Sequence, residues 1–295
     1  MKAPTNQFIG CDKPYREADT VLFGAPYDST TSFRPGTRFG PSAMRQESFG
    51  IETYSPALDK DLVDDTKVFD SGDLELPFGA PEPALKMIEE RAARILEDGK
   101  RPFLLGGEHL VTLGAFRAVQ KRHPDVVIIH FDAHADLRED YLGNPLSHAC
   151  VLRRCHDLIG DGRIFQFGIR SGTREEFRFM ADGHVTTEPF ADSTLESVVN
   201  RLATLQPCNP ATSQPVYLTI DMDVLDPSEF PGTGTQEAGG FSYLRLLADM
   251  RLICGKLNVV AMDNVELCRG LDPTGRSTAL ACKFLRECLL ALNSK

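Results

Sequence analysis

Three short segments of the sequence place His and Asp side chains at a spacing that suits metal binding. They read GGEH at 106–109, FDAHAD at 131–136 and TIDMDVLDP at 219–227. Residues two apart on an extended chain point to the same side, so the polar side chains of each segment can converge. Together the segments offer six candidate metal ligands: His109, Asp132, His134, Asp136, Asp221 and Asp223.

Four carboxylates gathered at one place repel one another and partly protonate unless a cation neutralises them. A pair of divalent metal ions resolves this conflict, and six ligands suffice when two carboxylates bridge the pair. An oxygen-rich set with some nitrogen favours Mn²⁺ over structural zinc, although Zn²⁺, Fe²⁺ and Co²⁺ remain open. One such segment alone is also compatible with a simple turn, because Asp is common in turns. Three of them in one chain favour a metal centre.

Each of the three segments follows a short apolar run, which is where the end of a buried strand is expected. Continuous runs rich in Val and Ile are typical of parallel strands that are covered on both faces. Ligands of such sheets bind beyond the carboxyl ends of the strands. The runs predict strands at 21–23, 103–105, 126–131, 164–167, 216–220 and 259–262.

Helical patterns lie between these runs. The segment 83–98 places apolar residues on one stripe of a 3.6-residue period, and 277–290 has apolar residues on one side and charges on the other. Further helices are expected near Glu108 and Phe241. Strands that alternate with helices predict an α/β fold with a mostly parallel sheet. With no linker or repeat in sight, we expect a single domain over residues 1–295.

Composition excludes several classes of protein. The chain has 295 residues, of which 42% are hydrophobic and 25% charged, so it is neither disordered nor collagen-like nor a disulfide-stapled miniature. A net charge of −10 makes it a poor nucleic-acid binder. No apolar run approaches the roughly 20 residues of a membrane span, and the first residues lack the apolar core of a signal peptide. The eight cysteines form no CxxC pair, so we expect buried free thiols in a reducing cytoplasm.

The three segments resemble the metal-binding motifs of the ureohydrolase family, which includes arginases, agmatinases, formimidoylglutamases and guanidinobutyrases. FRPGTRFGP at 33–41 and PGTGTQEAGG at 231–240 are similar to two further signatures of that family. The resemblance covers nearly the whole chain. It implies a three-layer α/β/α domain with a central, mostly parallel sheet of eight strands, two Mn²⁺ per subunit, and assembly into homo-trimers or hexamers.

The resemblance also assigns the metal ligands. One metal ion would take His109, Asp132, Asp136 and Asp221. The other would take Asp132, His134, Asp221 and Asp223, so that Asp132 and Asp221 bridge.

The reaction implied by the resemblance is hydrolysis of a guanidinium group to urea and an amine, by attack of a metal-bridging hydroxide. Asp136 would orient that hydroxide, and Glu266 would bind the guanidinium nitrogens, since a carboxylate matches a planar fork of donors. His148 would pass a proton to the leaving amine. Taken without the resemblance, His148 is a lone loop histidine.

The resemblance implies that the loop 137–147 recognises the tail of the substrate, and this loop looks most like that of bacterial-type agmatinases. The expected reaction is therefore hydrolysis of agmatine, a small cationic guanidino substrate, to putrescine and urea, a step of polyamine biosynthesis. Arg138 leaves a second interpretation open, because it could pair with the carboxylate of 4-guanidinobutyrate or a related guanidino acid. It could equally form a surface ion pair with Glu139 or Asp140, or an intersubunit contact.

Arginase activity is less expected, and a non-catalytic metal-binding homologue least of all, because all six ligands are present. A deacetylase-like hydrolase would need a His-His pair, which the sequence lacks.

Several residues receive plainer interpretations. Thr235 and Glu237 are candidates to support the metal ligands from behind, and Asp226-Pro227 predicts a turn. Cys150 and Cys268 depart from the family pattern and could make the enzyme sensitive to oxidation. Among the other histidines, His130 is expected to pack in the core, and three are expected at the surface or in turns: His123, His156 and His184.

Overall fold

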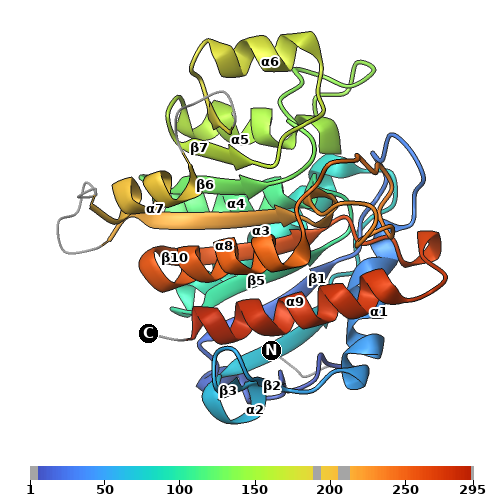
Figure 1. Ribbon diagram of the computed structural model, residues 1–295, viewed down its shortest axis with the longest axis vertical. Helices are drawn as coiled ribbons and strands as arrows, with labels where there is room; N and C mark the ends of the chain where they lie inside the picture. The colour runs from blue at the N-terminus through green and yellow to red at the C-terminus, as the bar shows by residue number, and fades with distance from the viewer. Residues whose placement is uncertain (1–5, 189–193, 205–212, 294–295) are drawn as a thin grey trace.

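The computed structural model describes residues 6–188, 194–204 and 213–293. Its centre is an all-parallel sheet of eight described strands in the order β4-β1-β5-β10-β9-β6-β7-β8 (Figure 1). The strands span Thr20–Ala25 (β1), Val68–Asp73 (β4), Arg101–Gly106 (β5), Val127–Phe131 (β6), Ile164–Phe167 (β7), Thr186–Thr187 (β8), Pro215–Asp221 (β9) and Asn258–Val265 (β10). A separate antiparallel pair joins β2 (Tyr54–Ser55) to β3 (Lys60–Asp61).

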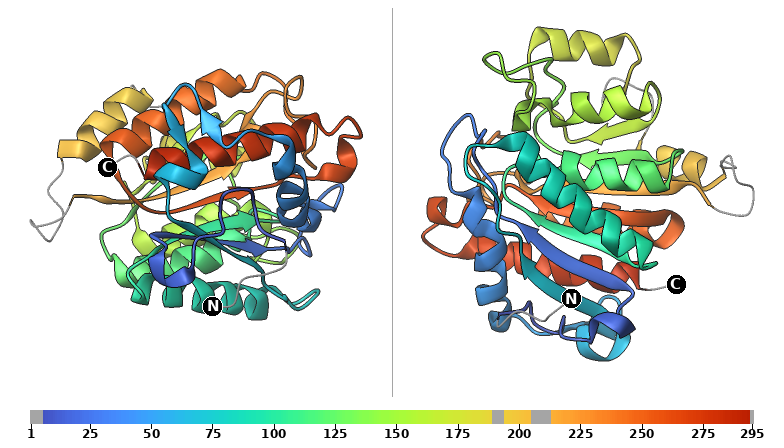
Figure 2. Two further views of the ribbon diagram at one scale, coloured as in Figure 1. Left: turned by 90° about the horizontal axis from the view of Figure 1, so that it is seen from below. Right: turned by 180° about the vertical axis from the view of Figure 1, so that it is seen from behind.

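Helices cover both faces of the sheet, with α8 and α9 in front in Figure 1 and α3 and α4 in front when the molecule is seen from behind in Figure 2. The α-helices are α1 (Gly40–Glu47), α2 (Leu62–Asp65), α3 (Pro81–Glu97), α4 (Val111–Arg122), α5 (Val151–Ile159), α6 (Arg174–Ala181), α7 (Leu195–Thr204), α8 (Tyr243–Lys256) and α9 (Arg276–Leu292). Short 3₁₀ turns are η1 (Tyr15–Glu17), η2 (Thr37–Phe39), η3 (Ser48–Gly50), η4 (His148–Cys150), η5 (Met222–Val224) and η6 (Arg269–Leu271).

Side chains of the central strands alternate between two hydrophobic cores, one on each face of the sheet. Phe103 and Leu105 of β5 pack with residues of α7, α8 and α9, whereas Leu104 between them packs with residues of α3, α4 and α5. The alternation follows from the two-residue period of a strand. Because both faces are covered, the central strands are mostly apolar, and the three-layer α/β/α architecture that the family resemblance implies is confirmed.

The six predicted strands all form, as β1, β5, β6, β7, β9 and β10. The apolar runs did not predict the two outer strands, β4 and β8. The β4 strand is partly polar, and its buried Asp70 accepts hydrogen bonds from the buried Arg45 at 2.7 and 3.0 Å. The β8 strand has only two residues, too few to form an apolar run.

The predicted helices also form. In α9, two of the charged residues, Arg286 and Glu287, are buried. Glu287 accepts hydrogen bonds from Arg286 at 2.6 Å and from Ser55 at 3.0 Å, and also from Arg251 of α8. These partners satisfy the carboxylate, because the β2–β3 pair and α8 cover that side of the helix.

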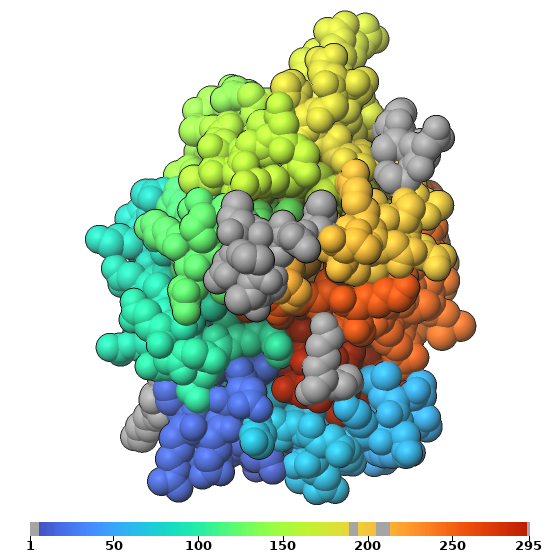
Figure 3. Space-filling view, turned by 90° about the vertical axis from the view of Figure 1, so that its left-hand side faces the viewer, coloured from blue at the N-terminus to red at the C-terminus, as the bar shows by residue number. Residues whose placement is uncertain are grey.

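Loops that follow the carboxyl ends of β1 and β9 lie on the right of Figure 1, and Figure 3 views the opposite side. No helix in the described part of the chain is long and apolar enough to span a membrane.

Candidate metal centre and active site

The predicted metal ligands and Glu266 follow four strands that are neighbours in the middle of the sheet, β5, β10, β9 and β6. His109 lies three residues beyond β5, Asp132 comes directly after β6, and Asp221 ends β9. Glu266 comes directly after β10. Because the strands are parallel and adjacent, their carboxyl ends bring these side chains to one place.

Glycine is required where the loop after β5 turns toward the site. A Cβ on Gly107 would lie 2.0 Å from the carbonyl oxygen of Tyr27. This close approach is stabilised by the hydrogen bond from Glu108 N–H to the same oxygen, at 2.8 Å. The helix expected near Glu108 therefore begins only at Val111, and His109 stays in the loop, free to face the sheet edge.

Three carboxylates surround one nitrogen of His109. Its Nδ1 lies 3.0 Å from Asp132 Oδ2, 3.2 Å from Asp136 Oδ2 and 3.4 Å from Asp221 Oδ2. All four side chains are buried. This is the first of the two ligand groups expected from the sequence.

A second group forms around His134. Its Nδ1 lies 3.0 Å from Asp223 Oδ2 and 3.4 Å from Asp132 Oδ1. Asp132 thus directs one oxygen to His109 and the other to His134. A carboxylate in this orientation is suited to bridge two cations.

The electrostatics of this cluster favour bound cations. Burial, together with the negative charges of Asp223 and Asp132, raises the pKa of Asp221 well above its usual value. Burial also raises the pKa of Asp223. Burial acts on Asp132 in the same direction, but the histidines around it, His109, His130 and His134, hold its pKa well below the usual range. Buried carboxylates with such conflicting pKa values are the arrangement that divalent metal ions neutralise.

A hydrogen-bond chain behind His109 fixes which of its nitrogens can bind a metal. Asp263 accepts hydrogen bonds from the hydroxyl groups of Thr219 at 2.6 Å, Tyr217 at 2.6 Å and Thr112 at 2.9 Å. The only hydroxyl hydrogen of Thr219 is used in this way, so Thr219 Oγ1 must accept from His109 Nε2–H, 2.9 Å away. The lone pair of Nδ1 then faces the carboxylates, as a metal ligand requires.

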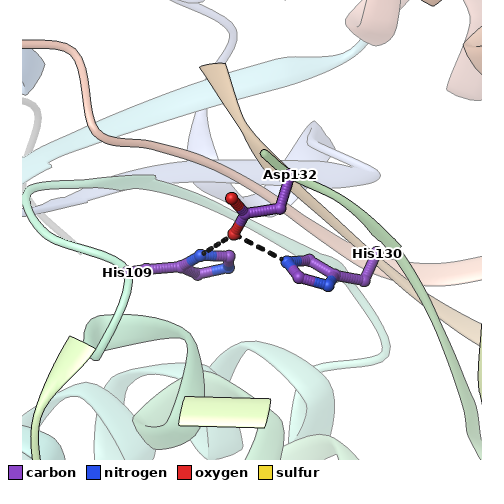
Figure 4. Close-up of side chains that lie close together, drawn as sticks. All are labelled: His109, His130 and Asp132. Carbon is purple, nitrogen blue, oxygen red and sulfur yellow. Dashed lines mark hydrogen bonds and ion pairs between the residues drawn. The ribbon is translucent and has the colours of Figure 1, made fainter. Parts of the chain in front are cut away.

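His130 contacts the cluster but is oriented as a donor rather than a ligand (Figure 4). Gln166 directs its amide nitrogen to the carbonyl of Ala135 at 2.8 Å and to His130 Nδ1 at 3.0 Å, and its amide oxygen accepts from Thr187. His130 Nδ1 is therefore an acceptor, and Nε2–H donates to Asp132 Oδ2 at 2.9 Å. His130 is buried in the core as predicted, but its contact with Asp132 was missed. The two-residue spacing from Asp132 was the available signal.

Two residues of the site adopt the left-handed backbone region, which is unusual for residues other than glycine. The φ of Asp136 is 54° and that of Glu266 is 66°. The carbonyl of Asp136 accepts from the backbone N–H groups of Leu152 and Arg153 at the start of α5, while Glu266 N–H donates to Gly107 at 2.8 Å. Strain held in place by such contacts is typical of functional residues.

Glu266 and His148 face each other across the site. Glu266 Oε1 accepts from the backbone N–H of His109 at 2.8 Å and lies 3.6 Å from His148 Nδ1. Burial alone would lower the pKa of His148, but the hydrogen bond to Glu266 and its charge raise that pKa to about 9. The carboxylate of Glu266 thus favours the protonated form of His148.

The loop after β1 holds His148 from the other side, and these contacts were missed. The backbone N–H of Ser32 donates to His148 Nε2 at 3.1 Å, and the Ser32 hydroxyl lies 3.0 Å from the same nitrogen. Thr30 Oγ1 accepts from the backbone N–H of His148 at 3.2 Å and donates to the buried Glu108 at 2.6 Å. No local pattern marks these residues, because they are more than 100 positions from His148 in the sequence.

A cavity of about 240 Å³ opens onto the site, and both His134 and Glu266 line it. Arg138 also lines it, with its Nε 3.7 Å from the buried Glu176 and its guanidinium over the ring of Tyr141. Arg138 therefore forms an ion pair, as one interpretation expected, but with a different partner.

The neighbours suggested as partners for Arg138 do not pair with it among the described contacts. Glu139 instead pairs with Arg153 at 2.8 Å and with Arg154 at 3.1 Å. These two arginines lie at the start of α5 and draw Glu139 away from the cavity.

The remaining candidate residues lie near the proposed metal ligands or are buried close to the site. Thr235 lies 3.5 Å from Asp223 Oδ2, and Glu237 accepts from Ser171 at 2.9 Å. Cys150 and Cys268 are buried, and burial raises the pKa of both thiols, to about 12 for Cys150. Few thiolates form under these conditions, which argues against easy oxidation.

The described cysteines are all free and buried, as expected, and Cys208 lies outside the described residues.

Asp226 forms the predicted turn and also accepts from the N–H groups of Ser228, Gly239 and Gly240.

Comparisons with known proteins agree with this geometry. The model of the arginase family matches residues 18–291. The chain is 46% identical to the agmatinase of Bacillus subtilis over 96% of this chain and 95% of that protein. It is 34% identical to the guanidinobutyrase of Pseudomonas aeruginosa, over 93% and 86% respectively. The solved agmatine ureohydrolase of Thermoplasma volcanium superposes with a TM-score of 0.85 at 32% identity, covering 98% of this chain and 94% of that one.

An eight-stranded parallel sheet with His and Asp gathered at its carboxyl edge defines an arginase-like metalloprotein. The chain belongs to the arginase family. Family membership together with the two ligand groups implies a binuclear metal site.

Proposed function

We propose that this protein hydrolyses the guanidinium group of agmatine to putrescine and urea. The observation that carries the proposal is the meeting of two metal-ligand groups with Glu266 and His148 on one cavity. The 46% identity to an agmatinase over nearly the full length supports agmatine as the substrate.

The residues present fit two Mn²⁺ ions. His109, Asp132, Asp136 and Asp221 would hold one of them. Asp132, His134, Asp221 and Asp223 would hold the other. The donors are mainly carboxylate oxygens with one imidazole per ion, which suits Mn²⁺, and His109 offers its lone pair on the correct nitrogen. When bound, the ions lower the pKa of a water molecule and so supply a nucleophile at neutral pH.

Glu266 binds and orients the guanidinium. One of its oxygens already accepts from the backbone of His109, and the strained backbone at Glu266 sets the direction of the carboxylate. A carboxylate that accepts from two guanidinium N–H groups fixes the planar carbon of the substrate in place. Asp136, held by the start of α5, would orient the attacking water.

His148 supplies the proton that the leaving amine needs. Its raised pKa keeps it protonated at neutral pH, and Glu266 stabilises the cation from 3.6 Å. Ser32 contacts the imidazole, and Thr30 accepts from the backbone N–H of His148, so that both hold the residue in place at the cavity. After donating its proton, His148 is reloaded from solvent through the open side of the cavity.

The environment of Arg138 bears on whether agmatine or a guanidino acid is the substrate. Its positive charge is already compensated by the buried Glu176, so a substrate carboxylate would have to compete with that ion pair. This favours the carboxylate-free substrate. The alternative function is that of a guanidinobutyrase, which the presence of Arg138 on the cavity wall supports.

The test is urea release by the Mn²⁺-loaded protein from agmatine, 4-guanidinobutyrate and arginine in parallel. We expect agmatine to be preferred by more than about 100-fold in kcat/KM, which corresponds to about 2.7 kcal/mol of transition-state stabilisation. A preference for 4-guanidinobutyrate would overturn the agmatine assignment and identify Arg138 as the carboxylate-binding residue.

We further propose that the chain forms one unit that assembles into a homo-trimer or hexamer in the cytoplasm. The buried free thiols of the described cysteines are compatible with that compartment.

A further inference from the structure

A second cluster of metal-ligating side chains lies outside the candidate active site. His156 near the end of α5, Asp161 in the turn before β7 and His184 before β8 come together there. His156 Nε2 lies 2.7 Å from Asp161 Oδ1, and His184 Nδ1 lies 2.9 Å from the same oxygen. From the sequence, His156 and His184 were expected to be separate surface or turn residues.

Aromatic packing orients both imidazoles before any ion binds. The ring of Phe179 stacks on His184 at a centroid distance of 4.3 Å and meets the edge of His156 at 4.9 Å. The guanidinium of Arg153 lies over Phe179. The histidine side chains are 14% and 38% exposed, whereas the Asp161 side chain is 63% exposed. Two fixed imidazoles therefore face one movable carboxylate.

The cluster is remote from the cavity described above. Asp161 and His184 precede β7 and β8, so they lie at the amino-terminal edge of the sheet, opposite the edge where His109 and Asp132 gather. In Figure 1 this region is the upper part of the molecule, around α5 and β7, and Figure 3 views the amino-terminal edge directly.

We propose that His156, Asp161 and His184 form a binding site for a divalent cation of the zinc type. Two imidazole nitrogens and one carboxylate oxygen are ligands that Zn²⁺ prefers, whereas Mg²⁺ and Ca²⁺ prefer oxygen. Tetrahedral zinc holds such ligand atoms about 3.3–3.5 Å apart, given metal–ligand bonds of about 2.0–2.2 Å. The exposed side chain of Asp161 reaches this spacing by a small rotation, and water completes the fourth position.

Such an ion would tie α5 to the turns that lead into β7 and β8. This is a structural role at the periphery of the sheet. It goes beyond the proposed agmatine hydrolysis and does not depend on it.

The test counts metal ions. Untagged protein is loaded with Mn²⁺, freed of unbound metal by gel filtration, and dialysed against micromolar free Zn²⁺. Manganese and zinc are then measured together per chain. Replacement of Mn²⁺ by Zn²⁺ in the active site leaves the total unchanged, whereas an additional site raises it by one.

Matched variants locate the added ion. We expect the total to rise by one in the wild-type chain and in the control His123→Gln, whose histidine ends α4 elsewhere. We expect no rise in His156→Gln, His184→Gln or Asp161→Asn. Circular dichroism and manganese content verify that each variant is folded. An unchanged total in the wild-type chain, or a rise that persists in the cluster variants, would overturn the proposal.

Discussion

Replacing Asp263 by Asn should weaken metal binding, although Asp263 touches none of the proposed metal-binding atoms. Asp263 accepts from Thr219, which leaves Thr219 as the acceptor for His109 Nε2–H. An amide NH₂ facing Thr219 would reverse this bond, because Thr219 would then donate its hydrogen to His109 Nε2. The proton of His109 would move to Nδ1, which then could not bind a metal ion.

The size of this effect follows from the kind of contact that is lost. Residues that orient a metal ligand from behind typically change metal affinity about 10- to 100-fold, or about 1.4–2.7 kcal/mol. Competition with a chelator of known affinity, monitored on the folded variant, measures the Mn²⁺ dissociation constant directly.

Tyr217→Phe is the matched control. It removes one of the three hydrogen bonds to Asp263 but leaves Thr219 and its orientation intact. We expect it to lower the free energy of unfolding by about 1.5–3 kcal/mol, because a buried bond to a charged group is lost, and to leave Mn²⁺ affinity unchanged. If Asp263→Asn binds Mn²⁺ like the wild type, or Tyr217→Phe loses as much affinity, the reasoning is refuted.

Three further predictions concern the cavity. Glu266→Gln should lower kcat/KM for agmatine about 10- to 150-fold, because the lost bonds to a charged group are worth about 1.5–3 kcal/mol. The manganese content should stay unchanged. Normal turnover by this variant would contradict the role of Glu266. The pKa of His148 is raised to about 9, so its protonated form, and with it kcat, should fall as the pH rises through about 9. The stability that protonated His148 contributes to the folded protein is present in full below the unfolded pKa of about 6.5 and is lost as the pH rises toward 9. His148→Asn should remove both the fall in kcat and this loss of stability. If the variant keeps the pH profile of the wild type, His148 is not the proton donor. Arg138→Gln should change kcat/KM little for either agmatine or 4-guanidinobutyrate, because Glu176 already compensates the charge of Arg138. A selective loss for 4-guanidinobutyrate would identify Arg138 as a carboxylate-binding residue.

The central strands could be predicted from the sequence because burial on both faces leaves continuous apolar runs, as in β5, β6 and β9. The two outer strands lack such an apolar run. The β4 strand carries Asp70, which is paired with Arg45, and β8 is too short to form an apolar run. The total of eight strands was expected only from the family resemblance.

The ligand groups could also be predicted, because the spacing of residues at the end of a strand determines which side chains point in the same direction. The contacts around them could not. Ser32 reaches His148, and Asp263 reaches Thr219, through the packing of distant segments. His130 is the exception, since it lies two residues from Asp132 and on the same side of the chain. One of the interpretations of Arg138 paired it with a neighbour in sequence, whereas packing supplies Glu176.

The most direct test of the proposed reaction is the product analysis of agmatine turned over by Mn²⁺-loaded protein, with chelator-stripped protein alongside. We predict one urea and one putrescine for each agmatine consumed by the loaded protein, and no turnover by the stripped protein until Mn²⁺ is restored. Release of ammonia without urea, or equal turnover by the stripped protein, would contradict metal-dependent hydrolysis of the guanidinium group.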